Sequence, residues 1–287
     1  MKKYWYRRIL IMALVFFVSV GGSYLLIEQK KDAMRREVSA QTSEEDLVIP
    51  GGMPVGIYMK TKGVMVLDTQ KIKGEDGSEY EPALHIVKAG DYITGFNGKD
   101  INTKNELVEA VSSFSEQKAK LDICRKGETI HVKMDMIQCE DGTKKLGIWV
   151  RDNAQGLGTI TYLDSDSHFG ALGHGIHDID TGELLNISDG TLYLTSVKEI
   201  QKGVNGTPGG MEGIIVYNNY NVLGKIKKNT EAGIFGTIDR VDVLFANQTP
   251  VQLAKKEEVE EGPAIIRCAV DGEIKEIRLM DHKIIIK

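Results

Sequence analysis

Residues 146–164, LGIWVRDNAQGLGTITYLD, open the part of the chain whose pattern decides the fold. Branched and aromatic residues alternate here with glycine, which is typical of strands and tight turns, and the stretch is interpreted as two strands. From Lys145 onward similar runs recur between glycine turns, with no helical period longer than two turns. This spacing predicts a mainly β fold, a barrel or a sandwich, for the second half of the chain.

Composition limits the class of protein. The chain has 287 residues and a formal net charge of −5, and this length suggests about two domains of roughly 100–200 residues each. The basic residues are scattered and form no lysine- and arginine-rich face with interleaved aromatic residues, so nucleic acid is not an expected partner. The odd number and wide spacing of Cys124, Cys139 and Cys268 favour buried thiols over a disulfide framework or a zinc knuckle.

The amino-terminal region contains an uncharged apolar run, ILIMALVFFVSVGGSYLLI, at residues 9–27. It is long enough to cross a bilayer as a helix. Equal numbers of basic residues lie on the two sides of the run, so they do not set its orientation. The positive charge of the free amino terminus then favours a cytoplasmic location of residues 1–8. A cleaved signal peptide is the alternative, because residues 38–40 resemble a cleavage site. Their distance from the apolar run favours an uncleaved anchor.

Residues 47–139 have a different pattern, which includes one helix. Asn102 or Thr103 can cap this helix, with Glu106 close to the capping-box position. The apolar face of the helix is expected to consist of Leu107, Val108 and Val111. The other expected elements are a strand-like stretch over 55–72 with a turn at Lys62-Gly63, a strand over 92–96, a type I′ turn at Asn97-Gly98, the helix over 103–113 and a hairpin around Lys126-Gly127.

This region resembles a PDZ domain. The resemblance is carried by Pro82-Ala83, Ala89-Gly90-Asp91, Ile93, Asn97-Gly98 and the helix that follows. It implies a module that captures a peptide end or an internal strand by strand addition between an edge strand and the helix. It places the carboxylate-binding loop at Pro54 to Ile57, so the expected peptide-binding residues are Val55, Gly56 and Ile57. The alternative is a small barrel that only orients its neighbour.

Residues 168–185, HFGALGHGIHDIDTGELL, contain three of the six histidines: His168, His174 and His177. A zinc site could combine His174 and His177 with Asp178 and Asp180. The glycines disfavour a helix, however, and positions 174 and 177 of a strand face opposite sides, so no metal site is predicted. Glycines on both sides of His174 fit the close approach of a peptide backbone to a general base. A histidine satisfied within a glycine-rich turn is an equal alternative on spacing alone.

The same stretch belongs to a longer resemblance. The runs LGTITYLDSDSHFGALGHGIHDIDTGELLNISDG, SVKEIQKGVNGTPGGMEG and GKIKKNTEAGIFGTI resemble the stage IV sporulation protein B peptidase family over residues 145–287. The resemblance implies a cofactor-free serine endopeptidase with a chymotrypsin-like double barrel and a His–Asp–Ser triad. His174 matches the family's catalytic histidine, which would take the serine proton and later give it to the leaving amine.

The resemblance also implies a biological setting. The peptidase would act in the space between the two forespore membranes. It would cleave a regulator of a membrane-embedded protease and so trigger sigma-factor processing. The expected partners are this protein substrate, peptide termini bound by the PDZ-like domain, and the membrane that holds the amino-terminal helix, with the bulk of the single-pass chain extracytoplasmic.

The sequence departs from the family pattern after His174. No Gly-x-Ser-Gly follows, and the serines there, Ser188 and Ser196, have ordinary strand or turn contexts. Thr207 in GVNGTPGG superficially imitates a nucleophile turn, but a structural turn is favoured. Asp178 and Asp180 lie too close to His174 in sequence to orient its ring and are assigned to the turn. The nucleophile and the acid of the triad are therefore missing.

The last part of the chain is interpreted as a hairpin with an Asp-Gly turn at 271–272, followed by a new strand at 283–287 without a partner. We therefore expect a carboxy-terminally truncated, incomplete barrel that is inactive alone. A catalytically inactive PDZ peptide-binding protein is the alternative. The expected organisation is a cytoplasmic tail (1–8), a transmembrane anchor (9–27), a linker (28–46), a PDZ-like domain (47–139) and a sporulation-peptidase domain (145–287).

Overall fold

The structure is a computed structural model that describes residues 47–246, 248–259, 262–270 and 273–279. It is mainly β, as the sequence predicts. The predicted anchor, the linker and the strand at 283–287 lie outside the described residues. Within the described ranges, no helix combines the length and the apolar character needed to cross a membrane.

The first half of the chain forms short strands and one helix. Its elements are β1 (Leu47–Pro50), β2 (Pro54–Thr69), β3 (Ile72–Lys73), β4 (Glu79–Tyr80), β5 (Tyr92–Phe96), β6 (Lys99–Asp100), α2 (Lys104–Ser113), β7 (Lys118–Arg125), β8 (Glu128–Asp135), β9 (Ile137–Gln138) and β10 (Lys144–Lys145).

The second half is almost entirely strands. Its elements are β11 (Ile148–Asp164), β12 (His168–Ala171), β13 (Ile187–Tyr193), β14 (Thr195–Gln201), β15 (Gly210–Ile215), the 3₁₀ turn η2 (Asn219–Asn221), β16 (Val222–Thr230), β17 (Gly233–Ile238), α3 (Val241–Phe245), β18 (Val251–Gln252), η3 (Lys256–Glu258), β19 (Ala264–Val270) and β20 (Glu273–Leu279).

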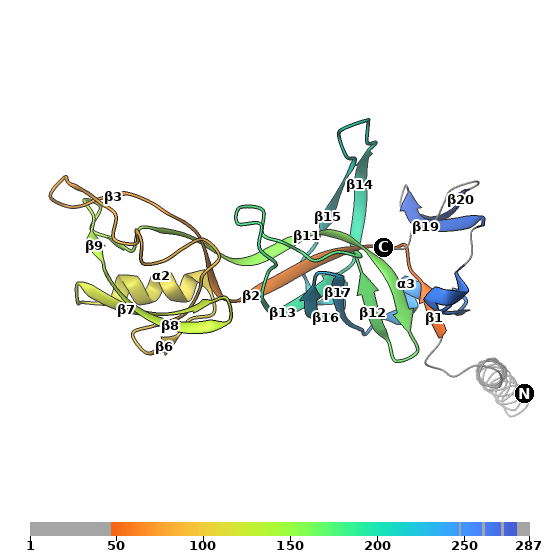
Figure 1. Ribbon diagram of the computed structural model, residues 1–287, viewed down its shortest axis with the longest axis horizontal. Coiled ribbons are helices and arrows are strands. Elements are labelled where there is room, and N and C mark those ends of the chain that lie inside the picture. Colours follow the sequence, from red (N-terminus) through yellow and green to blue (C-terminus); the bar gives the residue numbers. More distant parts are fainter. Residues whose placement is uncertain (1–46, 247, 260–261, 271–272, 280–287) are drawn as a thin grey trace, which may run out of the picture.

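Two long antiparallel strands, β2 and β11, run through both halves of the molecule (Figure 1). The stretch predicted as two strands is the single strand β11, because it pairs with β2 along most of its length. The predicted turn at Lys62-Gly63 is wrong, since β2 continues through it. Gly63 has a φ of +91°, and the pairing register shifts here from Met65 to Lys60. The glycine therefore serves an irregularity within a strand, which glycine tolerates well.

A barrel forms the centre of the second half. Its pairings make a ring in the order β2, β11, β12, β17, β16, β13 and back to β2. Its interior is filled by buried apolar side chains, among them Ile57, Met59, Ile160, Phe169, Leu192, Leu223 and Ile234. The structure thus places the first half of β2 in the barrel, whereas the sequence-based boundary assigns it to the PDZ-like domain.

The other unit, which we call the PDZ-like unit after the sequence resemblance, packs α2 against a sheet formed by the second half of β2 with β5, β7 and β8. The helix begins as predicted, because Thr103 is its N-cap and forms a reciprocal capping box with Glu106. The predicted apolar face is wrong at one position, since Val108 is 55% exposed and Ala110 is buried instead. The turns at Asn97-Gly98 and Lys126-Gly127 are confirmed by positive φ at all four residues.

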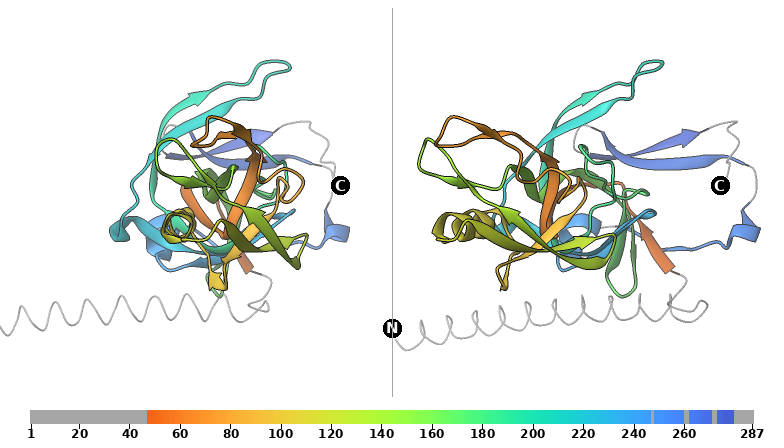
Figure 2. Two further views of the ribbon diagram at one scale, coloured as in Figure 1. Left: turned by 90° about the vertical axis from the view of Figure 1, so that its left-hand side faces the viewer. Right: turned by 60° about the vertical axis from the view of Figure 1, so that its left-hand side comes forward.

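Two hairpins stand apart from the barrel ring. β14 and β15 pair with each other and form an arm that projects from the barrel (Figure 2). β19 and β20 pair in register on either side of residues 271–272, which confirms the predicted hairpin. All three cysteines are free, and Cys139 is buried.

Candidate functional site

His174 follows a sharp departure of the chain from the barrel wall. Strand β12 ends at Ala171, and the next two residues, Leu172 and Gly173, have φ of +74° and +75°. A branched side chain in this left-handed region is unusual, and such conformations gather at functional sites. Leu172 N–H still donates to the carbonyl of Thr159 at 3.1 Å. His174 is therefore the second residue after the chain has left β11.

The ring of His174 is held in one orientation by its own neighbour. Nδ1 lies 2.9 Å from the carbonyl oxygen of Gly175. A carbonyl can only accept, so Nδ1 carries the hydrogen, and in the neutral ring Nε2 then keeps a free lone pair. A general base requires such an acceptor. The ring borders two cavities, of about 800 Å³ and about 280 Å³.

Gly175 leaves no room for a side chain in its present position. A Cβ at this position would lie 2.6 Å from the carbonyl oxygen of Thr230 and would collide with Leu184. Gly175 N–H donates to the carbonyl of Glu231 at 3.2 Å, which joins the start of the loop to the turn just after β16. The glycine therefore brings the histidine-bearing loop into direct contact with the barrel wall.

Asn229 at the end of β16 clamps the same loop. Its Oδ1 accepts from Ile176 N–H at 2.9 Å, and its Nδ2 donates to the carbonyls of Ile176 at 2.8 Å and Leu185 at 2.9 Å. The sequence analysis missed this residue. Its signal is an asparagine in a strand-like run, and the partner Ile176 lies 53 residues away, so local pattern could not identify the contact.

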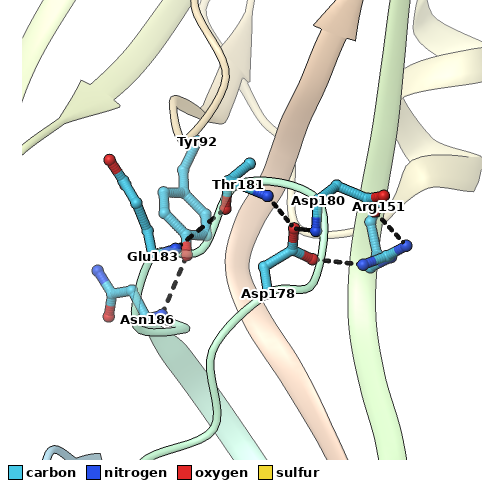
Figure 3. A network of polar contacts seen from close by, with 7 residues as sticks. All are labelled: Tyr92, Arg151, Asp178, Asp180, Thr181, Glu183 and Asn186. Atoms are coloured by element: carbon cyan, nitrogen blue, oxygen red, sulfur yellow. Dashed lines mark hydrogen bonds and ion pairs between the residues drawn. The ribbon is translucent and has the colours of Figure 1, made fainter.

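Asp178 organises the turn beyond the clamp (Figure 3). Its side chain is 1% exposed, and it accepts the backbone N–H groups of Asp180 and Thr181 at 3.0 Å each. Arg151 of β11 bonds Asp178, and it also donates to Asp180 at 2.8 Å. This placement agrees with the assignment of both aspartates to the turn, because Asp178 accepts two backbone N–H groups and Arg151, and Asp180 accepts Arg151.

The loop also touches the PDZ-like unit. Asn186 N–H donates to the hydroxyl of Tyr92 at 3.1 Å, and burial raises the pKa of that phenol (Figure 3). A Cβ at Gly90, which has a φ of +85°, would lie 2.5 Å from Oε2 of Glu183. The loop that carries His174 is therefore fixed from the barrel on one side and from the PDZ-like unit on the other.

The predicted peptide-binding residues lie elsewhere than expected. Val55 and Ile57 are 0% and 2% exposed, within β2 and not in a loop. Gly56 and Ile57 pair with β11 on one side and with β13 on the other. Their backbone groups belong to these ladders, so the structure forms no carboxylate-binding loop at this position. The segment pairs on both edges because it is one of the strands of the closed barrel.

The other histidines have separate partners. Nδ1 of His168 lies 3.2 Å from Asp164. The ring of His177 lies 3.2 Å from the Gly175 carbonyl through Nδ1 and 3.3 Å from Glu231 through Nε2. Within the described ranges, no group of three or more His, Cys, Asp or Glu side chains could hold a metal ion.

The candidate hydroxyl nucleophiles are not assembled with His174. Ser188 donates to the carbonyl of Thr61 at 3.1 Å, and Ser196 lies on the projecting β14. Thr207 closes the tip of the β14–β15 arm by a pair of backbone hydrogen bonds with Val204. This placement agrees with the interpretation of the Thr207 stretch as a structural turn.

The described residues thus form a β barrel in which the ring of His174 is held by the Gly175 carbonyl beside two cavities. The family model described as SpoIVB peptidase S55 matches residues 142–286, half of the chain. The chain therefore belongs to the SpoIVB peptidase S55 family.

Comparisons with individual proteins are less extensive. None of the curated proteins matches the chain. Among solved structures, the PDZ domain of the SdrC-like protein from Listeria innocua is similar at 24% identity and a TM-score of 0.26, over 31% of this chain and 93% of that one. The PDZ domain of the SdrC-like protein from Listeria monocytogenes is similar at 22% identity and a TM-score of 0.25, over 31% and 87% of the respective chains.

Proposed function

We propose that the protein is a serine endopeptidase in which His174 is the general base. The observation that supports this most directly is the ring geometry, with Nδ1 bound to the Gly175 carbonyl and Nε2 left as the acceptor. His174 would take the proton of the attacking serine and return it to the leaving amine. The barrel ring would correspond to one half of a chymotrypsin-like double barrel.

The proposal extends to the setting of the reaction. Residues 9–27 would hold the chain in a membrane with its bulk extracytoplasmic, in the space between the forespore membranes. The substrate would be a regulator of a membrane-embedded protease, and its cleavage would start sigma-factor processing in sporulation. Membership of the SpoIVB peptidase family and the apolar amino-terminal run support this setting.

We further propose that residues 1–287 alone do not hydrolyse peptides. After His174 the sequence contains no Gly-x-Ser-Gly, Ser188 is bonded to a strand carbonyl, and Thr207 lies at the tip of an arm. A general base without a positioned hydroxyl gives no acyl transfer.

The test compares four preparations on quenched fluorescent casein. The protein purified from sporulating source cells should hydrolyse it. His174→Ala should lower that rate by about 10²-fold or more, since general-base catalysis contributes about 10²–10⁴-fold. The matched control His168→Ala, which changes another exposed histidine, should stay within about two-fold. Purified residues 1–287 should show no hydrolysis.

Each contrary result has a distinct meaning. Equal rates for the native protein and His174→Ala would refute the role of His174. Hydrolysis by residues 1–287 that is lost in Thr207→Val would identify Thr207 as the nucleophile. If the native protein from source cells is also inactive, the peptidase proposal fails and peptide binding by the PDZ-like unit is the function left.

A further inference from the structure

Strand β11 carries partners on its two edges in different places. The partner residues Pro50↔Tyr162 and Pro54↔Thr159 are consecutive, so β1 and β2 lie along one edge. β12 pairs along the other edge, from Leu163↔Phe169 to Ile160↔Ala171. Within the part of the chain that the structure describes, no strand pairs with this second edge from Ile148 to Gly158. We name residues 153–158 of this edge the open edge.

The open edge begins where the histidine loop leaves it. Leu172 makes the last backbone contact with β11, through the Thr159 carbonyl. The positive φ of Leu172 and Gly173 then turns the chain away and brings His174 out. A strand that continued in line with β12 beyond Leu172 would therefore run along the open edge, close to His174.

A cavity of about 280 Å³ fills the space between the open edge and the loop. Its walls are Ala154 to Leu157 on the β11 side and Leu172 with His174 to His177 on the loop side, and Ile57 and Met59 complete the lining. Most of these side chains are apolar, and His174 is at the rim. The space is bounded by strand backbone on one side and by the proposed general base on the other.

The residues of the open edge suit close approach by another backbone. Gly156 and Gly158 are two residues apart in the strand, so side chains at these two positions would point to the same face. A Cβ at Gly158 would lie 2.6 Å from both Ile57 and Leu172, whereas a Cβ at Gly156 would meet nothing within 4 Å. The cavity is therefore open at Gly156. Glycine in a strand often marks a place where a ligand or a second backbone comes close.

We propose that an extended peptide segment of the substrate adds to the open edge of β11 as an antiparallel or parallel strand, with its scissile bond beside His174. Main-chain hydrogen bonds supply affinity in this mode, and pockets for alternate side chains supply preference. The cavity would take an apolar side chain of the peptide. The inference rests on the proposed peptidase function for its substrate class, and it places binding on residues 153–158 and not on Val55 to Ile57.

The edge also connects the two units. β11 begins at Ile148 beside α2 of the PDZ-like unit and reaches the His174 loop without interruption. Between these two ends, Arg151 of β11 bonds Asp178 and Asp180 of the histidine loop. The proposed binding is therefore confined to the open edge, next to the general base.

The test measures binding by the full chain with His174→Ala, so that hydrolysis does not enter. The probe is a library of acetylated decapeptides that carry one p-benzoylphenylalanine and random residues elsewhere. After irradiation, mass spectrometry should locate crosslinks at residues 153–158 and 172–177. Gly156→Val, whose Cβ has room, should lower the crosslink yield at least five-fold by filling the cavity.

The matched control is Gly210→Val on β15, which also has room for a Cβ and lies outside the cavity lining. It should keep the yield within two-fold. On the peptide side, N-methylation of alternate amides should abolish crosslinking in one of the two alternation frames only, because a strand directs alternate N–H groups to each edge. Loss in both frames or in neither would contradict strand addition.

The outcomes separate this inference from the proposed function. Hydrolysis of casein by the native protein together with crosslinks outside both residues 153–158 and residues 172–177 overturns the inference alone. Crosslinks at the open edge without any hydrolysis support strand addition at this edge, but they refute the peptidase and with it the placement of a scissile bond beside His174. Equal crosslink yields for Gly156→Val and Gly210→Val also overturn the inference, provided that thermal unfolding shows both variants to be folded.

Discussion

Replacement of Asn229 tests whether the position of His174 depends on a distant clamp. Asn229→Ala removes three hydrogen bonds, one to Ile176 N–H and two to the carbonyls of Ile176 and Leu185. At about 0.5–1.5 kcal/mol net for each bond, the free energy of unfolding should fall by about 1.5–4.5 kcal/mol. The loop should also become less firmly held to β16, because the Gly175 N–H bond to the Glu231 carbonyl, just after that strand, does not replace the three bonds of Asn229.

Asn229→Asp is a sharper change of nearly equal shape. The carboxylate keeps an acceptor for Ile176 N–H, but it sets a second acceptor against two carbonyls. Repulsion should make it at least as destabilising as alanine at neutral pH. The same repulsion should raise the pKa of the new carboxyl above its ordinary value of about 3.9. The folded state then binds more protons than the unfolded state, so stability should increase as the pH falls.

Two measurements on the full chain decide the matter. Urea unfolding gives the free energy, and ¹⁵N NMR with labelled histidine gives the tautomer of His174. The native protein should show the Nδ1–H form, and Asn229→Ala should show a mixture. A loss below about 0.5 kcal/mol together with an unchanged His174 signal would refute the clamp, since a single net hydrogen bond is worth about that much. Destabilisation with an unchanged tautomer would mean a purely structural role.

Two further predictions concern charged groups. Arg151→Leu leaves the buried carboxylate of Asp178 without its partner and should cost about 3–5 kcal/mol in urea unfolding, because an uncompensated buried charge is strongly unfavourable; a loss below that of an exposed ion pair, about 1 kcal/mol, would contradict this. The pKa of Asp141 is lowered from 3.8 to about 2, and the largest cause is the hydrogen bond from the Thr143 hydroxyl. Thr143→Val should therefore raise this pKa toward 3.8, which NMR titration measures. The stabilising contribution of the Asp141 charge, present above pH 3.8 and lost as the pH falls through about 2, should then be lost at a higher pH; an unchanged titration would assign the shift to Lys145 and the backbone.

Local features of the fold were predictable because their causes are local. The capping box of Thr103 and Glu106 and the turn at Asn97-Gly98 depend on residues within a few positions of each other. The mainly β class follows from strand-like runs and glycine turns in the same way. His174 could be proposed from the sequence as a candidate general base because its motif, two glycines around a histidine, is contiguous.

The remaining features depend on partners far away in the chain. Val55 to Ile57 read as a loop in sequence, but pairing with β11 and β13 makes them a buried strand. Gly63 resembles a turn residue, yet it lies in a strand irregularity because β11 holds both flanks of β2. Asn229 and Arg151 act on the histidine loop across 53 and 27 positions, and no sequence period reports such contacts.

The course of β2 changes how deletion experiments on this protein should be interpreted. A deletion of residues 47–139, chosen from the sequence to remove peptide recognition, would also remove the first half of β2, which pairs with both β11 and β13. The remaining barrel would lack one strand and expose the side chains that Ile57 and Met59 now cover. Loss of activity in such a deletion would then report a collapsed scaffold. Point substitutions therefore test the proposed roles of the two units separately, whereas this deletion does not.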